Sequence, residues 1–435
     1  MTAAACCWLG LFPLLHFGSY HTITEDKLTL MWILDGITLA CFLLDARARR
    51  LSFPGWLPLL AGGGLLGWMI VSSLLSPYPA TVWWPGSGRY EGLSTQLGYL
   101  GLFFLFSFSR VRRGPVLMSA AGGLAVFLTV VLLQRGGGNP FGLYPEEFSF
   151  DNASYFQGTI GNVDMCSGYL VIVCGIFLSA LVDAVRQLVR PREAEGETRG
   201  KAALAACGIL AVLAMDAFLL ITMDVQSGLL ALAVLLVWTP LCFLPKKARI
   251  PCLLLVLAAV LVFVWLGLVP SGPAYELHEI LHGRVQPSFG SGRVEVWLLS
   301  LRMLRADSRL WTGSGADTFS IRFNTYLRGY YAMHPEIRWM DDTYDSPHCE
   351  YLALVINFGI PALLFHLALL LAGCLGPAPW HGSILGYAVQ AALSFSVCLV
   401  APMFWVVLGL SCASGRTGFP WSKKQDPRLE PADPA

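Results

Sequence analysis

Long apolar stretches separated by short polar connections recur along most of the chain. A helix that crosses a membrane needs about 20 mostly apolar residues, and about twelve stretches approach this length. They lie near residues 4–18, 28–45, 56–75, 93–109, 115–133, 165–185, 202–222, 227–244, 251–269, 351–375, 383–400 and 402–413. Because helices satisfy their own backbone hydrogen bonds in lipid, we expect an all-α polytopic membrane protein with about twelve transmembrane helices.

The composition supports this interpretation. Hydrophobic residues make up 55% of the 435 positions and charged residues 13%, whereas a soluble domain carries about 25% charged residues. The formal net charge of +1 excludes the broad basic surface that binds nucleic acid. We therefore expect membrane lipid, and no nucleic acid, among the partners.

The distribution of positive charge predicts the orientation. Cytoplasmic connections of membrane proteins carry an excess of Lys and Arg, and the even-numbered connections here do so, as does the C-terminal tail. These residues are Arg47, Arg49, Arg50, Arg110, Arg112, Arg113, Arg186, Arg190, Arg192, Arg199, Lys201, Lys246, Lys247, Arg249, Arg416, Lys423, Lys424 and Arg428. We expect a multi-pass protein of the cell membrane with both termini in the cytoplasm.

Four regions follow from this pattern. We expect an N-terminal membrane region of about nine helices at 1–269, an outward-facing loop at 270–349, further membrane helices at 350–413 and a cytoplasmic tail at 414–435. The tail is rich in Pro, Lys and Asp, which is typical of disorder. The long loop exceeds the size of an ordinary connection, and such loops usually carry function.

Within the long loop, apolar residues recur at helical spacing. They are Val294, Trp297, Leu298, Leu301 and Leu304, and arginines fall between them. This pattern predicts an amphipathic helix that lies on the membrane face.

Titratable residues precede one apolar stretch closely. His348 and Glu350 stand just before the run Leu352 to Cys374. A His titrates near neutral pH, so this placement predicts acid–base chemistry at a bilayer surface. The alternative is a His that caps an interfacial helix, because Ser346 and Pro347 suit a helix start.

Outward-facing arginines are candidates for anion binding. Arg89 and Arg293 each lie among Gly and Ser, which let the backbone approach a ligand closely. A guanidinium group matches phosphate oxygens in a bidentate way. Attraction to anionic lipid headgroups is the alternative, and it explains Arg302, Arg305 and Arg309 at least as well.

Several short motifs, taken in order, resemble those of one known family. The segment His348-Cys349-Glu350-Tyr351-Leu352, followed by Asn357-Phe358-Gly359-Ile360-Pro361, is similar to the "H-N-x-Y-L…G-I-x-G" signature of the O-antigen ligase and polymerase family. Three further segments resemble family patterns. Ser291 to Trp297, with Gly313-Ser314-Gly315, is similar to "G-R-x-x-x-W…G-x-G". Gly88 to Gly92 is similar to "R-Y-E-G", and Gly161-Asn162 is similar to "G-N".

The resemblance implies a GT-C-like membrane protein whose large extracytoplasmic loop is catalytic. It implies metal-independent, inverting transfer of a glycan from a polyprenyl-pyrophosphate carrier to a sugar hydroxyl of a glycan or glycolipid acceptor, with no cofactor. The implied catalytic residues are His348 as general base, Arg293 and Glu350. The implied substrate-binding residues are Arg89, Arg293, Arg322, Tyr90 and Asn162.

One position departs from the family pattern. Many members carry Ser-Arg-Gly where this chain has Gln226-Ser227-Gly228, and that Arg helps to hold the carrier phosphate. Either Arg89 or Arg322 replaces it, or the donor is held differently, or the activity is weakened. The resemblance does not separate ligase from polymerase. A transporter of a lipid-linked glycan or small anion is the alternative function, which buried carboxylates such as Asp216 would suit.

Overall fold

The structure is a computed structural model that describes residues 1–48, 50–84, 89–145, 155–189, 196–267, 269–334, 343–376 and 380–413. The predicted tail at 414–435 lies outside the described residues, as do Arg49, Arg190 and Arg192. The helices are α1 (Thr2–Cys6), α2 (Ile23–Arg47), α3 (Trp56–Leu74), α4 (Leu93–Ser107), α5 (Arg113–Arg135), α6 (Val163–Val189), α7 (Gly196–Met223), α8 (Gln226–Leu241), α9 (Lys246–Trp265), α10 (Pro273–Leu281), α11 (Arg293–Ala306), α12 (Phe319–Met333), α13 (Glu350–Cys374), α14 (His381–Gln390) and α15 (Ala401–Cys412).

Short elements complete the fold. A π-helix, η1 (Cys7–Leu11), continues α1, and 3₁₀ turns occur at η2 (Pro140–Gly142) and η4 (Ser308–Leu310). Strands β1 (Phe156–Gln157) and β2 (Gly161–Asn162) pair antiparallel in a hairpin before α6.

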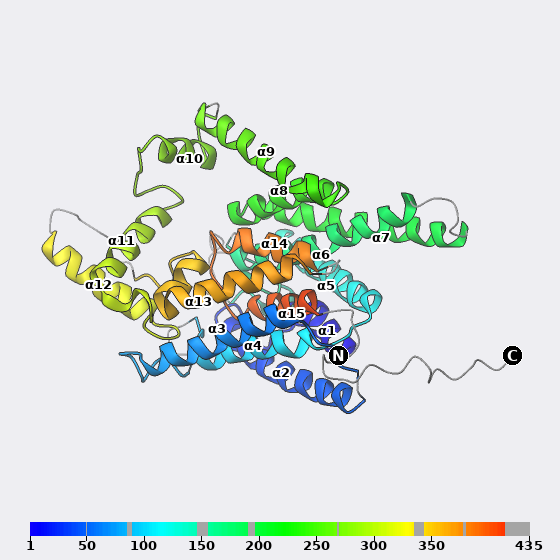
Figure 1. Ribbon diagram of the computed structural model, residues 1–435, viewed down its shortest axis with the longest axis horizontal. Coiled ribbons are helices and arrows are strands. Elements are labelled where there is room, and N and C mark those ends of the chain that lie inside the picture. Colours follow the sequence, from blue (N-terminus) through cyan, green and yellow to red (C-terminus); the bar gives the residue numbers. More distant parts are fainter. Residues whose placement is uncertain are drawn as a thin grey trace.

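The helices form a bundle around α6, which is almost entirely buried (Figure 1). Among the described residues, seven helices are long and apolar enough to cross a membrane: α2, α3, α5, α6, α7, α9 and α13. Shorter apolar helices, Thr2–Leu11, α4, α8 and α15, lie among them. The protein is therefore an all-α, multi-pass membrane protein, while a total of about twelve spans stays a prediction.

The structure of α13 differs from the single continuous span expected at 351–375. The helix is interrupted at Gly359, whose φ of 81° and ψ of 177° lie outside the helical region. Glu350 lies 3.9 Å from His366, measured from Oε1 to Nε2, whereas a straight helix would separate these residues by about 24 Å. The helix thus folds back on itself as a hairpin of two arms, Glu350–Phe358 and Ile360–Cys374.

The prediction of one continuous membrane span at 383–400 is also wrong. Helix α14 ends at Gln390, and residues 391–400 are irregular until α15 begins at Ala401. At 1.5 Å per residue, α14 extends only about 15 Å, half of the roughly 30 Å hydrocarbon core. Irregular backbone at this depth needs protein partners, and residues 391–400 are mostly buried. The pair α14–α15 therefore enters the bundle and returns.

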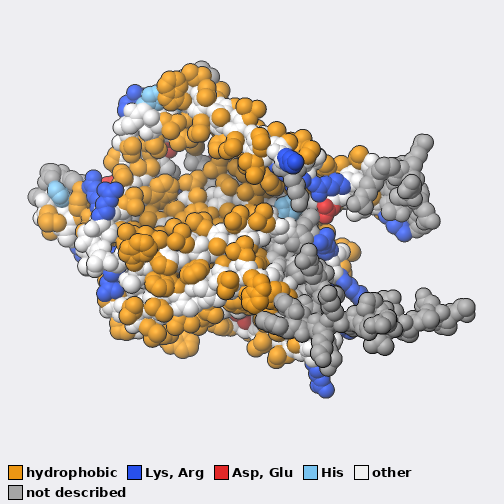
Figure 2. Space-filling view, viewed as in Figure 1, with side chains coloured by type: hydrophobic (Ala, Val, Ile, Leu, Met, Phe, Trp, Pro, Cys, Tyr) orange, Lys and Arg blue, Asp and Glu red, His pale blue; other side chains and the backbone are white. Residues whose placement is uncertain are grey.

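The two ends of the bundle carry different segments. At one end lie the α3–α4 connection, α11, α12 and the turn of α13 (Figure 1). There Arg309 of η4 donates to the Leu75 carbonyl at the end of α3. At the other end, Met1 pairs with Asp45, and Arg113 and Arg186 pair with Asp183. Figure 2 shows a face that is mainly hydrophobic between two ends that carry Lys and Arg.

A helix, α11, is present where the amphipathic helix was predicted, but its buried face differs from the expected one, and its position on the membrane face stays a prediction. Val296, Leu299, Met303 and Leu304 are buried against α12 and the first arm of α13. Leu298 and Leu301, which the pattern assigned to the apolar face, are more than 40% exposed. Since α11 packs on protein along one side, its remaining apolar side chains are free to face lipid.

Candidate active site

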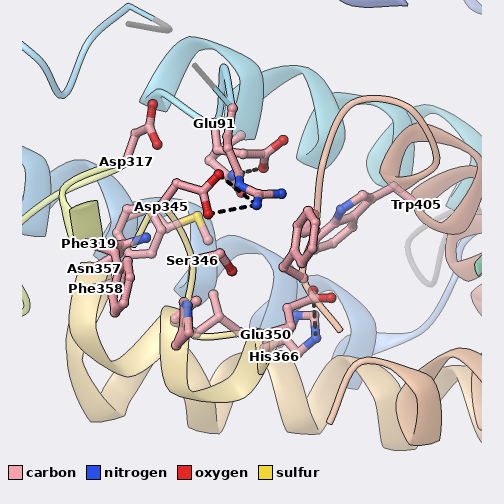
Figure 3. A pocket seen from close by; sticks show the side chains of 18 residues that line it. Glu91, Asp317, Phe319, Asp345, Ser346, Glu350, Asn357, Phe358, His366 and Trp405 are labelled. Carbon is pink, nitrogen blue, oxygen red and sulfur yellow. Dashed lines mark hydrogen bonds and ion pairs between the residues drawn. The ribbon is translucent and has the colours of Figure 1, made fainter. Parts of the chain in front are cut away.

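A cleft opens where the α3–α4 connection, the loop before α13 and the 391–400 segment meet (Figure 3). Its outer wall includes Arg89, Asp345, Ser346, Pro347 and Phe395. Deeper in the bundle it is lined by Glu91, Gln96, Glu350, His366 and Trp405. A concave site with a few convergent polar groups is the usual form of a binding or active site.

Arg89 is held from two sides in this cleft. Its guanidinium lies 3.6 Å from the centre of the Phe395 ring, and its Nη2 donates to Asp345 at 2.7 Å. A cation stacked on an aromatic face gains about 0.5–2 kcal/mol. The Nε of Arg89 is buried without a hydrogen-bond partner among the described residues. The side chain is thus fixed in place at the wall of the cleft.

His348 occupies a tight turn directly before α13. Its φ of 49° lies in the left-handed region, and its Nδ1 is 3.3 Å from the carbonyl oxygen of Ser346. Donation from Nδ1 to that carbonyl leaves Nε2 as the acceptor nitrogen. The ring meets the Phe395 ring edge-on, with centroids 5.1 Å apart. Phe395 therefore contacts both Arg89 and His348.

The surroundings of His348 favour its neutral form. Burial lowers the pKa of its imidazole below the usual value, and the charges of Arg89 and Arg293 lower it further. A neutral imidazole at working pH is the form that accepts a proton.

Arg293 reaches this region from the long loop. It is the first residue of α11, after three residues with positive φ, Gly290, Ser291 and Gly292. Trp297, one turn further along, donates from its indole nitrogen to the carbonyl of Pro347 at 2.8 Å. This bond holds α11 against the loop that carries His348, so Arg89, Arg293 and His348 are brought together.

Glu350 lies deeper in the bundle, at the end of the first arm of α13 that is far from the turn at Gly359. Its backbone nitrogen donates to the Ala391 carbonyl, and its carboxylate accepts from Tyr387 at 2.9 Å. Figure 3 shows its side chain beside that of His366. Glu350 is thus anchored to α14 and the irregular segment, and its carboxylate faces the inner part of the cleft.

Of the predicted site residues, Arg89 and Glu350 line the cleft, whereas the other five do not. His348 and Arg293 lie next to it, and the remaining three are held by contacts elsewhere. Arg322 is 5% exposed and bonds the Ile356 carbonyl, the Ser314 hydroxyl and Asp307. Tyr90 donates to Glu25, and this contact is the main cause that raises the pKa of Tyr90 to about 12. Asn162 accepts from the backbone nitrogen of Asp164 at 2.8 Å, at the start of α6.

Some residues of the site escaped the sequence analysis. Glu91 was quoted only as part of a motif; burial raises the pKa of its carboxyl to about 8, although Tyr99 and Gln96 donate to it. His366 is an ionisable residue within an apolar run, which is a signal that could have flagged it. Phe395 has no sequence signal, because its role depends on the break after α14. The described residues contain no group of three or more His, Cys, Asp and Glu side chains that could hold a metal.

Residues 209–367 match the model of a protein family described as O-antigen ligase. This segment of the chain is similar to the O-antigen ligase family. The matched part runs from α7 into the second arm of α13, so it contains Arg293, Arg322, His348, Glu350 and His366, whereas Arg89 and Asn162 precede it. No curated protein matches the chain.

Proposed function

We propose that the protein transfers a glycan from a polyprenyl-pyrophosphate carrier to a sugar hydroxyl of a glycan or glycolipid acceptor, in the assembly of cell-envelope polysaccharide. The observation that carries this proposal is the convergence of Arg89, Arg293 and His348 beside one cleft, in a chain with a segment similar to the O-antigen ligase family. The family match supports a membrane glycan ligase or polymerase role in general.

The proposed step is a single displacement at the anomeric carbon. The acceptor hydroxyl attacks this carbon, and its proton passes to Nε2 of His348. The bond from the anomeric carbon to the phosphate oxygen breaks, and polyprenyl pyrophosphate leaves with the electron pair. The configuration at the carbon is inverted. General-base assistance of this kind contributes roughly 10²- to 10⁴-fold.

The arginines would stabilise the leaving group. Pyrophosphate gains negative charge as it departs, and fixed cations near this charge lower the barrier. Arg89 lines the cleft, and Arg293 starts a helix, whose free backbone N–H groups also favour anions. Arg322, Tyr90 and Asn162 stay predictions as substrate-binding residues.

The test is a transfer assay with purified full-length protein in detergent. Polyprenyl-pyrophosphate oligosaccharide is the donor, and EDTA is present throughout. Wild type is expected to form longer or newly attached glycan, and His348→Ala to lose at least about 100-fold in rate while donor binding is kept. His282→Ala, at an exposed histidine directly after α10, serves as the matched control and should retain activity.

Two results would contradict the proposal. Transfer by His348→Ala at the wild-type rate would remove His348 from the chemistry. Donor movement across a vesicle membrane without any new glycosidic bond would favour the transporter alternative, for which substitutions at the cleft should give only graded losses.

A further inference from the structure

The cleft contains a buried imidazole whose polar atoms are unused. His366 is 1% exposed, and both of its ring nitrogens lack a hydrogen-bond partner among the described residues. Its nearest recorded polar neighbour is Glu350 Oε1 at 3.9 Å, which exceeds hydrogen-bond distance. Buried polar atoms are nearly always satisfied in proteins, and His366 lines the cleft. Its partner is therefore expected to come from the cleft itself.

The surroundings of His366 supply hydrogen-bonding groups and an aromatic wall. Glu350 lies beside it, and the indole of Trp405 is 5.9 Å away between ring centroids. Glu91 is close enough to Glu350 for that carboxylate to raise its pKa. This combination of carboxyl groups, an imidazole and an indole suits a ring that bears several hydroxyls and an apolar C–H face.

The charges restrict what can enter this inner part. Arg89 is the one permanently cationic side chain among the described residues that line the cleft, and it is engaged by Phe395 and Asp345 in the outer wall. A negatively charged group placed beside Glu350 and Glu91 would find no Lys or Arg among the described residues of this inner part to balance its charge. Since buried, unpaired charges are costly, the inner part favours an uncharged ligand.

We infer that the inner part of the cleft, lined by Glu91, Glu350, His366 and Trp405, is a subsite for one uncharged sugar residue. The phosphate-bearing part of the donor stays outside, at Arg89 and Arg293. This inference rests on the proposed function and specifies its substrate: the sugar held here is a neutral hexose or N-acetylhexosamine rather than a uronic acid.

Binding can be measured without any transfer reaction. Full-length protein in detergent is titrated with the methyl glycosides of glucose, galactose, mannose, rhamnose and N-acetylglucosamine, with methyl glucuronoside, and separately with inorganic pyrophosphate. The readout is the shift of the thermal unfolding midpoint. At least one neutral glycoside is expected to stabilise wild type, whereas methyl glucuronoside is not.

Variants in the two parts of the cleft test glycoside binding and pyrophosphate binding separately. Glu350→Gln and His366→Phe are expected to weaken neutral-glycoside binding at least about tenfold, as loss of a buried hydrogen bond does, while the pyrophosphate shift is kept. Arg89→Ala should show the reverse. Glu295→Gln, a half-buried glutamate on α11 outside the cleft lining, is the matched control.

The inference is overturned if no neutral glycoside stabilises wild type, if methyl glucuronoside stabilises it equally, or if both inner variants bind the glycoside normally. Should His366→Phe fail to fold, the nearly isosteric Glu350→Gln decides. If the glycoside and pyrophosphate effects separate as expected but wild type forms no product in the transfer assay, the subsite stands and the proposed reaction fails.

Discussion

Arg89 and Arg322 lie at the same end of the bundle, yet their surroundings differ. Arg322 is enclosed by protein partners: a carbonyl of α13, a hydroxyl of the loop before α12 and the carboxylate of Asp307. Arg89 lines the cleft and rests on an aromatic ring and one half-exposed carboxylate. A cation surrounded by protein acceptors serves the fold, whereas one that lines a cleft is suited to bind a ligand.

The position of each arginine explains this difference. The first arm of α13 ends near Asn357, so the carbonyls of its last turn lack helical partners. Arg322 donates to one of them and places a positive charge at the negative end of that arm. Arg89 lies on an irregular connection, where no helix end requires its charge.

Removing Arg322 should have the largest effect on folding. Arg322→Met leaves the Ile356 carbonyl and Asp307 without their partner, and loss of a buried ion pair costs about 3 kcal/mol or more. We use the lower end of this energy range because the Asp307 side chain is 35% exposed, so solvent screens the ion pair. The unfolding midpoint should fall markedly, whereas Arg328→Met, on an exposed site of the same helix, should change it little. An unchanged unfolding midpoint would indicate that Arg322 binds a ligand rather than stabilises the fold.

Removing Arg89 should weaken binding rather than folding. A charge-assisted hydrogen bond contributes about 1.5–3 kcal/mol, so Arg89→Ala should reduce donor affinity roughly 10- to 100-fold. The exposed Arg305→Ala is the control for general attraction to anionic lipid. Titration of the donor into detergent-solubilised protein measures the effect. An equal loss in both variants would show that the cleft position of Arg89 has no special importance.

Removing the ring of Phe395 should shift a pH profile. Phe395→Leu loses a stacking contact of about 0.5–2 kcal/mol with Arg89 and admits water to His348, so the depressed pKa of His348 should rise towards its ordinary value. Since the neutral imidazole is the active form, activity should be lost at a higher pH on acidification than in wild type. Phe395→Tyr keeps the ring and should keep the wild-type profile. Identical profiles for Phe395→Leu and wild type would mean that the ring does not shield His348.

Removing the side chain of Asn162 should have the smallest effect. Asn162→Ala loses an acceptor at the start of α6, which costs about 1 kcal/mol. Thermal unfolding and donor titration together distinguish the two possible roles. A small loss of stability with normal donor affinity identifies a capping residue, and a loss of affinity restores the predicted role in substrate binding.

The sequence predicted the membrane helices because each needs only a sufficient length of apolar residues. It also selected Arg89, Arg293 and His348, because motif order and outward placement were visible in one dimension. It did not predict the return of α13, since Gly359 and Pro361 interrupt a run whose hydrophobicity stays uniform. The proximity of Glu350 to His366, and hence the inner part of the cleft, depends on that return.

Other features that the sequence did not reveal also have tertiary causes. Asp307 and Ser314 enclose Arg322 only because α12 packs on the first arm of α13. Phe395 becomes a support for Arg89 and His348 only because α14 ends at Gln390. Neither arrangement leaves a periodic signal, since both depend on contacts between segments far apart in the chain.

The irregular segment 391–400 has a consequence for biogenesis. Its peptide groups cannot leave the translocation machinery for bare lipid, so this segment should settle only after the surrounding helices have closed around a protected interior. The part of the cleft wall that carries Phe395 is therefore completed late in assembly. A nascent chain that stops before residue 391 would already contain His348, Arg89 and Arg293, and it would still lack the support that holds them together.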